Sequence, residues 1–150
     1  MNERFDYPIN LVPDPDGGYV VTLVDFEEGV TQGETETDAL AQAEDLLDEV
    51  VACRMHDNQD VPPASTAMGR PVVSLSPRTT IKVSIYRAMR NAGMSKAELG
   101  RRLGWHMPQV MRLFDVRHET QLDQLEAALA VFGWRMRVTI QEMSTGAMPC

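Results

Sequence analysis

The sequence is poor in cysteine and has no long apolar run, and each shortage excludes a class of protein. Only two cysteines occur, Cys53 and Cys150, which are too few for a disulfide framework and fit a reducing cytoplasm. No apolar run approaches the roughly 18 residues that a membrane-spanning helix needs. The charged start MNERFDYP lacks the apolar core of a signal peptide. We therefore expect a cytoplasmic protein without a membrane anchor.

The motifs of common catalytic and metal sites are also missing. The chain has no glycine-rich phosphate loop, no nucleophile elbow and no histidine–carboxylate motif. Cys53 and His56 have the spacing of a metal-binding pair, but a tetrahedral site needs a second pair that the sequence lacks. A divalent-metal nuclease is the one enzymatic alternative, built from the carboxylates of Asp16, Asp25, Glu27 and Glu28. We expect no enzyme, no cofactor and no bound metal.

Charge is abundant but unevenly distributed. The net charge is −8, yet residues 1–76 carry 3 basic and 16 acidic side chains, whereas residues 77–150 carry 11 basic and 6 acidic ones. Within residues 78–117, 9 basic side chains occur beside only 2 acidic ones. A basic segment attracts phosphate, and an acidic one repels nucleic acid and suits a basic protein. The chain therefore offers two surfaces with different partners.

The first 60 residues are predicted to form strands and then a helix. Apolar alternation predicts strands over residues 5–11 and 19–24, joined as an antiparallel hairpin, and a short third strand over Val30–Gly33. A capping box at Thr35–Asp38 then opens an amphipathic helix. Its outer face, either a solvated surface or a docking site, carries four carboxylates: Glu44, Asp45, Asp48 and Glu49.

Residues 61–77 are predicted to connect two domains. They lose helical periodicity, contain four prolines and mark the point at which the sign of the charge changes. The apolar stretch Val72–Leu75 could form a short strand within this connector. Beyond the connector the pattern indicates four helices, with further capping boxes that begin at Ser95 and Thr120.

The segment Lys96–Leu113 has the spacing of a helix-turn-helix, although a plain helical hairpin is the alternative. Gly100 allows two helices to approach closely, and Gly104 supplies the positive φ that the turn needs. In a helix-turn-helix the second helix enters the major groove with its first residues against base edges. We expect DNA contacts from Lys96, Arg101, Arg102, His106, Met107, Gln109, Arg112 and Arg117.

The segment Trp134–Ile140 alternates as a half-buried strand that has no predicted partner nearby. Its apolar face carries Trp134, Met136, Val138 and Ile140. Antiparallel pairing with the same strand of a second chain would satisfy its backbone and produce the dimer that palindromic half-sites require. The alternative is that this strand folds back onto the sheet of its own chain.

Two N-terminal motifs resemble those of a known family. The run Asp16–Val21 is a Gly-Gly-Tyr hairpin, and Thr31–Thr35 is a Thr-x-Gly-acidic-Thr step before the alanine-rich helix. With the connector and the helix-turn-helix, these motifs make nearly the whole chain similar to the HicB antitoxins. The similarity is to the form that ends in a helix-turn-helix and not in a ribbon-helix-helix.

This resemblance implies an α+β protein of two domains. Residues 1–60 would form a small antiparallel sheet plus helix, a partial ribonuclease-H-like fold, and residues 78–150 an all-helical DNA-binding domain that ends in a dimerising strand. The implied partner is HicA, a small basic ribonuclease toxin with a double-stranded-RNA-binding-like fold and a catalytic histidine. We expect this toxin to contact Tyr19, Asp25, Phe26, Glu27 and Glu28.

The implied function is that of an antitoxin. It would neutralise a HicA-type mRNA-cleaving toxin and, as a homodimer on operator DNA, repress its own operon. Whether such dimers assemble further with the toxin stays open. The alternative function is that of a helix-turn-helix transcription factor whose N-terminal domain senses a ligand or mediates assembly.

Overall fold

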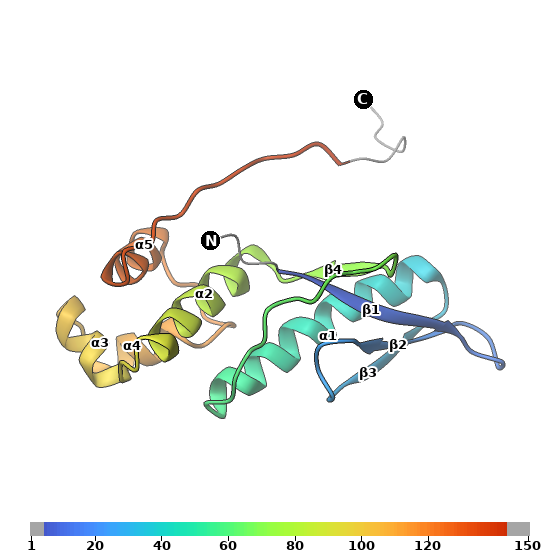
Figure 1. The fold of residues 1–150 in the computed structure, drawn as a ribbon, viewed down its shortest axis with the longest axis horizontal. Helices are drawn as coiled ribbons and strands as arrows, with labels where there is room; N and C mark the ends of the chain where they lie inside the picture. The colour runs from blue at the N-terminus through green and yellow to red at the C-terminus, as the bar shows by residue number, and fades with distance from the viewer. Residues whose placement is uncertain (1–4, 144–150) are drawn as a thin grey trace.

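The computed structural model describes residues 5–143 and has the expected α+β architecture (Figure 1). Cys150 lies outside the described residues. One antiparallel sheet has the order β3-β2-β1-β4, and its strands are β1 Asp6–Pro13, β2 Tyr19–Leu23, β3 Val30–Gly33 and β4 Val72–Ser74. The helices are α1 Glu36–His56, α2 Pro77–Asn91, α3 Lys96–Leu103, α4 Met107–Leu113 and α5 Leu122–Val131. No helix in this part of the chain is long and apolar enough to cross a bilayer.

The predicted hairpin and third strand are confirmed. β1 and β2 pair antiparallel from Ile9 opposite Leu23 to Pro13 opposite Tyr19, and β3 pairs along the other edge of β2. The turn between the first two strands closes with a hydrogen bond of 2.9 Å from the Asp14 N–H to the Gly18 carbonyl. Alternation of apolar and polar residues thus sets the register, as expected for a sheet with one buried face.

The fourth strand comes from the proline-rich connector. β4 pairs antiparallel with the first residues of β1, so β1 lies inside the sheet and not at its edge. Val61, Val73 and Leu75 are buried, which shows that the connector packs against the rest of the molecule. The division into domains at residues 1–60, 61–77 and 78–150 stays a prediction.

Helix α1 covers one face of the sheet and begins at the predicted cap. Thr35 Oγ1 accepts a hydrogen bond of 3.0 Å from the Asp38 N–H, while the Asp38 carboxylate accepts one from Glu34 and not from Thr35. A Cβ at Gly33 would lie 2.3 Å from the Ala39 nitrogen, so only glycine lets β3 and α1 approach this closely. The sheet and α1 share an apolar core that includes Tyr7, Ile9, Val21, Leu23, Ala39, Ala43, Leu47 and Val51.

The remaining helices form at the predicted places, but one predicted cap is wrong. Helix α5 begins at Leu122 with Gln121 at its N-cap, whereas the sequence predicted Thr120 there. The Thr120 N–H bonds to the His118 carbonyl in a preceding turn and is therefore not paired with Asp123, as the predicted capping box requires. The Thr120 hydroxyl is buried and has no hydrogen-bond partner within residues 5–143.

The predicted strand Trp134–Ile140 is not a strand in the single chain. The segment has no regular secondary structure, lies apart from the sheet (red in Figure 1) and pairs with none of its four strands, so it does not fold back onto the sheet of its own chain. Val138 is 71% exposed and Ile140 is 90% exposed. A strand requires a neighbour to bond to, and pairing with a second chain stays a prediction.

Candidate functional surfaces

Helices α3 and α4 are held together by the residues that the spacing singled out. Leu99, Val110 and Leu113 are fully buried between the helices. A Cβ at Gly100 would lie 3.1 Å from Val110 Cγ2, so the glycine permits the close approach that we predicted. Gly104 ends α3 with φ of 70°, the left-handed conformation that glycine adopts at no steric cost. The geometry of this helix pair is therefore rigidly specified.

The first turn of α4 is open to solvent. His106 occupies the N-cap position, and its N–H donates a hydrogen bond of 3.1 Å to Gln109 Oε1. His106 is exposed, and Met107 and Met111 are 45% and 49% exposed. The amide of Gln109, which is half-buried, therefore closes the helix start, a role that was not predicted from the sequence. A glutamine three residues after the cap is the signal that indicates it.

The basic residues near this helix, of which Lys96 is half-buried and the arginines are exposed, differ in what they bind. Arg101 and Arg102 both bind Glu98, which lowers the pKa of that carboxyl group. Lys96 places its ammonium 5.6 Å from the centre of the Phe114 ring. Arg112 is exposed and forms no ion pair with any residue that the structure describes.

Arg117, also predicted to bind DNA, is engaged by the sheet side of the molecule. Its Nη2 atom lies 2.6 Å from both carboxylate oxygens of Glu49 on α1. The pair is exposed, and the hydrogen bond to Glu49 raises the pKa of Arg117. The acidic face of α1 is therefore partly a contact with the helical side and not only a solvated surface.

Two of the nine basic residues counted at 78–117 are buried in α2. Lys82 is fully buried, and Arg87 is 7% exposed. Arg87 donates to the carbonyls of Val61 and Pro62 at 2.9 and 2.8 Å and to the Tyr7 hydroxyl at 2.7 Å. These two side chains serve the interior, so the sequence count overstates the basic surface.

The predicted toxin contacts separate into two places. Tyr19 begins β2 at the hairpin end, whereas residues 25–28 follow the opposite end of that strand. Glu27 is exposed, and Glu28 holds Arg54 through two hydrogen bonds of 2.7 and 2.9 Å. That contact lowers the pKa of Glu28. Of the predicted toxin contacts, only the acidic residues Asp25, Glu27 and Glu28 therefore lie together on one local surface.

Phe26 does not lie on that surface. It is 4% exposed, its ring centre lies 5.4 Å from that of Tyr7, and Arg54 covers its ring at 4.9 Å. The prediction of a toxin contact at Phe26 is therefore corrected: the ring anchors the acidic loop in the core. Asp25 is also engaged, since its carboxylate accepts a hydrogen bond of 3.1 Å from the Ser65 N–H.

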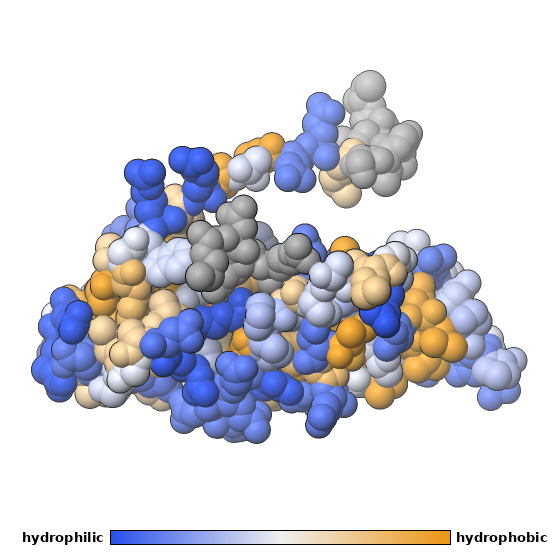
Figure 2. Space-filling view, in the orientation of Figure 1, coloured by the Kyte–Doolittle hydropathy of each residue, from blue (hydrophilic) through white to orange (hydrophobic). Residues whose placement is uncertain are grey.

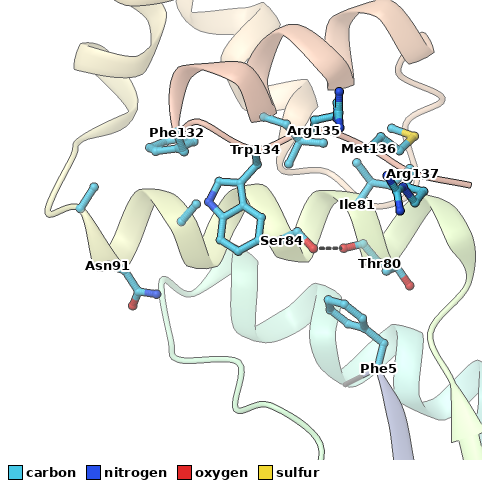
Figure 3. A pocket seen from close by; sticks show the side chains of 13 residues that line it. Phe5, Thr80, Ile81, Ser84, Asn91, Phe132, Trp134, Arg135, Met136 and Arg137 are labelled. Carbon is cyan, nitrogen blue, oxygen red and sulfur yellow. Dashed lines mark hydrogen bonds between the residues drawn. The ribbon is translucent and has the colours of Figure 1, made fainter. Parts of the chain in front are cut away.

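An apolar groove runs between α2 and the segment that follows α5 (Figure 3). Trp134 points toward α2, and Phe5 lies on the other side of the groove. Trp134 and Met136, two of the predicted dimer residues, line it. The other two, Val138 and Ile140, project beyond it.

Apolar side chains are exposed on the sheet as well. Figure 2 shows them over the strands, and Val12 and Val72 are 56% and 43% exposed. Within residues 5–143, no group of three histidine, cysteine, aspartate or glutamate side chains lies close enough to hold a metal ion.

Comparison with known proteins points to one family. The sequence model of the HicB-like antitoxin of bacterial toxin-antitoxin systems matches residues 6–84. The chain is 32% identical to an antitoxin HicB of Escherichia coli K12 over 85% of its own length and 93% of that protein. It is 30% identical to antitoxin HicB 1 of Photorhabdus laumondii, over 90% of this chain and 86% of the relative. An antitoxin HicB of Pseudomonas fluorescens is also 30% identical, over 91% and 94% of the two chains.

Proposed function

The chain belongs to the HicB antitoxin family, and we propose that it joins a toxin-neutralising surface to a DNA-binding one. It is an antitoxin of a toxin-antitoxin system, and such a system includes a toxin. The partner that we propose is a HicA-type mRNA-cleaving ribonuclease. We propose that the antitoxin acts in the cytoplasm by binding and not by catalysis, and that it represses its own operon.

The observation that carries the DNA-binding proposal is the open face of α4. The helix is held at a fixed angle by α3, its first turn is exposed, and Arg112 has no acidic partner among the described residues. A free guanidinium on a helix that fits the major groove can bind guanine through two hydrogen bonds. Lys96, Arg101 and Arg102 lie on α3, where we propose that they contact phosphates. These features support operator recognition by a helix-turn-helix.

The acidic sheet side supports the toxin-binding proposal. Glu27 and Glu44 are exposed carboxylates on a part of the chain with few basic residues. A basic ribonuclease would be attracted to such a surface over about 8 Å at physiological ionic strength. We propose that residues 25–28, supported by the buried Phe26, form part of the contact, together with Tyr19.

The exposed segment after α5 supports a homodimer. Its unpaired backbone and the apolar side chains of Val138 and Ile140 would be covered by the same segment of a second chain. Such a dimer would place two α4 helices on half-sites about one helical turn apart. We propose this dimer as the DNA-binding form.

The DNA-binding proposal is tested on a duplex that covers the region upstream of the chain's own gene. Arg112→Ala should cost roughly 1–3 kcal/mol and relax the preference at one base position. Lys96→Ala should weaken binding equally on all sequences and lower the salt slope by about one. If Arg112→Ala instead weakens every sequence alike, α4 does not read the bases. A full-length chain that binds no upstream DNA would refute operator binding.

The toxin proposal is tested by charge reversal in the full-length chain. Glu27→Lys should weaken inhibition of RNA cleavage by the co-encoded toxin, and the loss should shrink at high salt. Glu126→Lys is the matched control, since Glu126 is an exposed carboxylate on α5, away from the acidic loop. Equal inhibition by both variants would exclude the loop as a toxin contact. A chain that regulates DNA but leaves cleavage unchanged would favour the ligand-sensing transcription factor.

A further inference from the structure

Lys82 has an environment that neither toxin binding nor DNA contact explains. The residue is fully buried on α2, and its Nζ atom donates hydrogen bonds to three backbone carbonyls. The acceptors are Arg112 at 3.0 Å, Asp115 at 2.6 Å and His118 at 2.8 Å. An ammonium group has three donors, so this site uses all of them.

The three acceptors belong to the end of α4 and to the loop after it. The last carbonyls of a helix lack partners within the helix, and a cation at this end also interacts favourably with the helix dipole. Arg112 supplies one acceptor, so Lys82 grips the backbone of the residue whose side chain is the proposed base contact. The remaining two acceptors fix the loop that carries Arg117.

A purely stabilising role does not account for a charge at this position. Burying an ammonium group is costly, and a well-packed apolar side chain of similar volume often stabilises a protein as much or more. Contact with DNA phosphate is excluded in this conformation because the side chain is not exposed. What the charge supplies is a directional link between α2 and the end of α4.

We propose that Lys82 is a positioning residue for DNA recognition, which fixes the direction of α4, and with it Arg112, without touching DNA. This inference rests on the proposed operator binding. It separates Lys82 from Lys96, Arg101 and Arg102, which act by direct contact.

The protonation of Lys82 allows a test, because a purely structural role would not make operator affinity depend on pH in this range. Burial lowers the pKa of Lys82 to about 8, the Asp115 carboxylate acts to raise it and the Arg78 guanidinium acts to lower it. Loss of the proton leaves two donors for three carbonyls, which loosens the end of α4. Because the folded state has the lower pKa, the same loss of the proton stabilises the fold as a whole. Operator affinity should therefore fall from pH 7 to pH 9 while global stability does not.

The test measures binding of the full-length chain to the upstream duplex. Lys82→Met should weaken binding about tenfold and leave the salt slope unchanged, because no phosphate contact is lost. Lys96→Ala is the contact control, with a slope lower by about one. Lys82→Arg keeps its charge at pH 9, so its affinity should show a smaller decline with pH than the wild type shows.

Several results would overturn the proposal. One is that Lys82→Met binds the duplex as tightly as the wild type. Another is that the salt slope of Lys82→Met falls as it does in Lys96→Ala. A third is that the operator affinity of the wild-type protein stays constant from pH 7 to pH 9. If Lys82→Met does not fold, two other measurements test the proposal. One compares the operator affinity of the wild type with that of Lys82→Arg at pH 7 and pH 9. The other follows hydrogen exchange of the amides of residues 114–120 at the same two pH values. Because hydroxide itself speeds exchange of any amide, the quantity compared is the protection of each amide relative to an unstructured one at the same pH. Lower protection at pH 9 than at pH 7 supports the proposal, and equal protection at the two pH values contradicts it. Toxin inhibition by the same variants should stay unchanged, and a wild type that binds no DNA would refute the proposed function itself.

Discussion

The sheet side and the helical side of the molecule use their charged residues in opposite ways. On the sheet side, carboxylates such as Glu27, Glu44 and Asp45 lie exposed, and the acidic character predicted from the sequence is the character of the surface. On the helical side, basic residues are largely committed: Lys82 and Arg87 are buried, and Arg101 and Arg102 share Glu98. Net charge therefore describes an acidic surface well and overstates a basic one, because long basic side chains reach distant acceptors.

Helix α2 is where the two sides meet. It lies between the sheet and the other helices (Figure 1), and it turns Arg87 toward the sheet side and Lys82 toward α4. Two basic side chains of α2 thus bind backbone carbonyls on both sides of the molecule, Arg87 on the sheet side and Lys82 at the end of α4. Substitutions that disturb these and the other charged contacts should differ in effect according to how deeply each contact is buried.

Removing the buried guanidinium should have the largest effect on stability. Arg87→Met deletes charged hydrogen bonds to the Val61 and Pro62 carbonyls, at a cost of about 3 kcal/mol. The Val61 carbonyl loses this donor, whereas the Pro62 carbonyl keeps a hydrogen bond of 2.6 Å from the Tyr7 hydroxyl. Urea unfolding of the wild type and the variant measures this loss of stability. Arg90→Met is the control, because Arg90 is exposed and donates to the Asn58 carbonyl, and it should cost less than about 1 kcal/mol. Equal losses in both variants would show that burial of Arg87 adds nothing.

The buried ammonium group should give a pH dependence of stability. The pKa of Lys82 is about 8 in the folded chain against 10.5 when unperturbed, so the unfolded state binds more protons between these values. Stability therefore rises with pH from 8 to 10.5, by about 2 kcal/mol between pH 7 and pH 10. Urea unfolding of wild type and Lys82→Met at both pH values isolates this gain, which the variant should lack. Parallel pH dependence of the two proteins would contradict it.

The ion pair that joins the two sides should matter more for DNA binding than for stability. Glu49→Gln frees Arg117 for phosphate and should tighten binding to the upstream duplex about threefold, with a change in unfolding free energy below about 0.5 kcal/mol. Glu44→Gln removes the same charge from an exposed position on α1 and should have a smaller effect. Combining Glu49→Gln with Arg117→Ala should abolish the gain. Equal gains from both single variants would assign the effect to net charge alone.

The sequence predicts those features that depend on neighbours in the chain. Alternation predicts β1, β2 and β3, and the hydroxyl caps at Thr35 and Ser95 are confirmed. Gly100 also lies at the predicted close approach. These features follow from local backbone geometry and from one-sided burial.

The features that the sequence does not predict depend on contacts across the fold. Helix α2 is buried around most of its surface, so no single apolar stripe reveals that Lys82 and Arg87 point inward. Phe26 lies in an acidic loop whose composition suggests exposure, yet it packs against Tyr7. The capping box at Thr120 fails because the N–H that Asp123 would accept from bonds instead to the His118 carbonyl. Each miss comes from a partner that is distant in sequence or from a competing local hydrogen bond.

The smallest effect is expected at the ion pair of the acidic loop. Its hydrogen bond to Arg54 lowers the pKa of Glu28 from the usual 4.5, so the unfolded chain is protonated first as the pH falls. The stability that this pair contributes is therefore present above pH 4.5 and is lost as the pH falls through the lowered folded value. Glu28 is 44% exposed, which limits the contribution to less than about 1 kcal/mol. Glu28→Gln should lose this amount at pH 7, and its difference from the wild type in urea unfolding should shrink as the pH falls below 4.5. Glu27→Gln removes an exposed carboxylate without an ion pair to any residue that the structure describes, so a loss of the same size there would show that the contact with Arg54 contributes nothing.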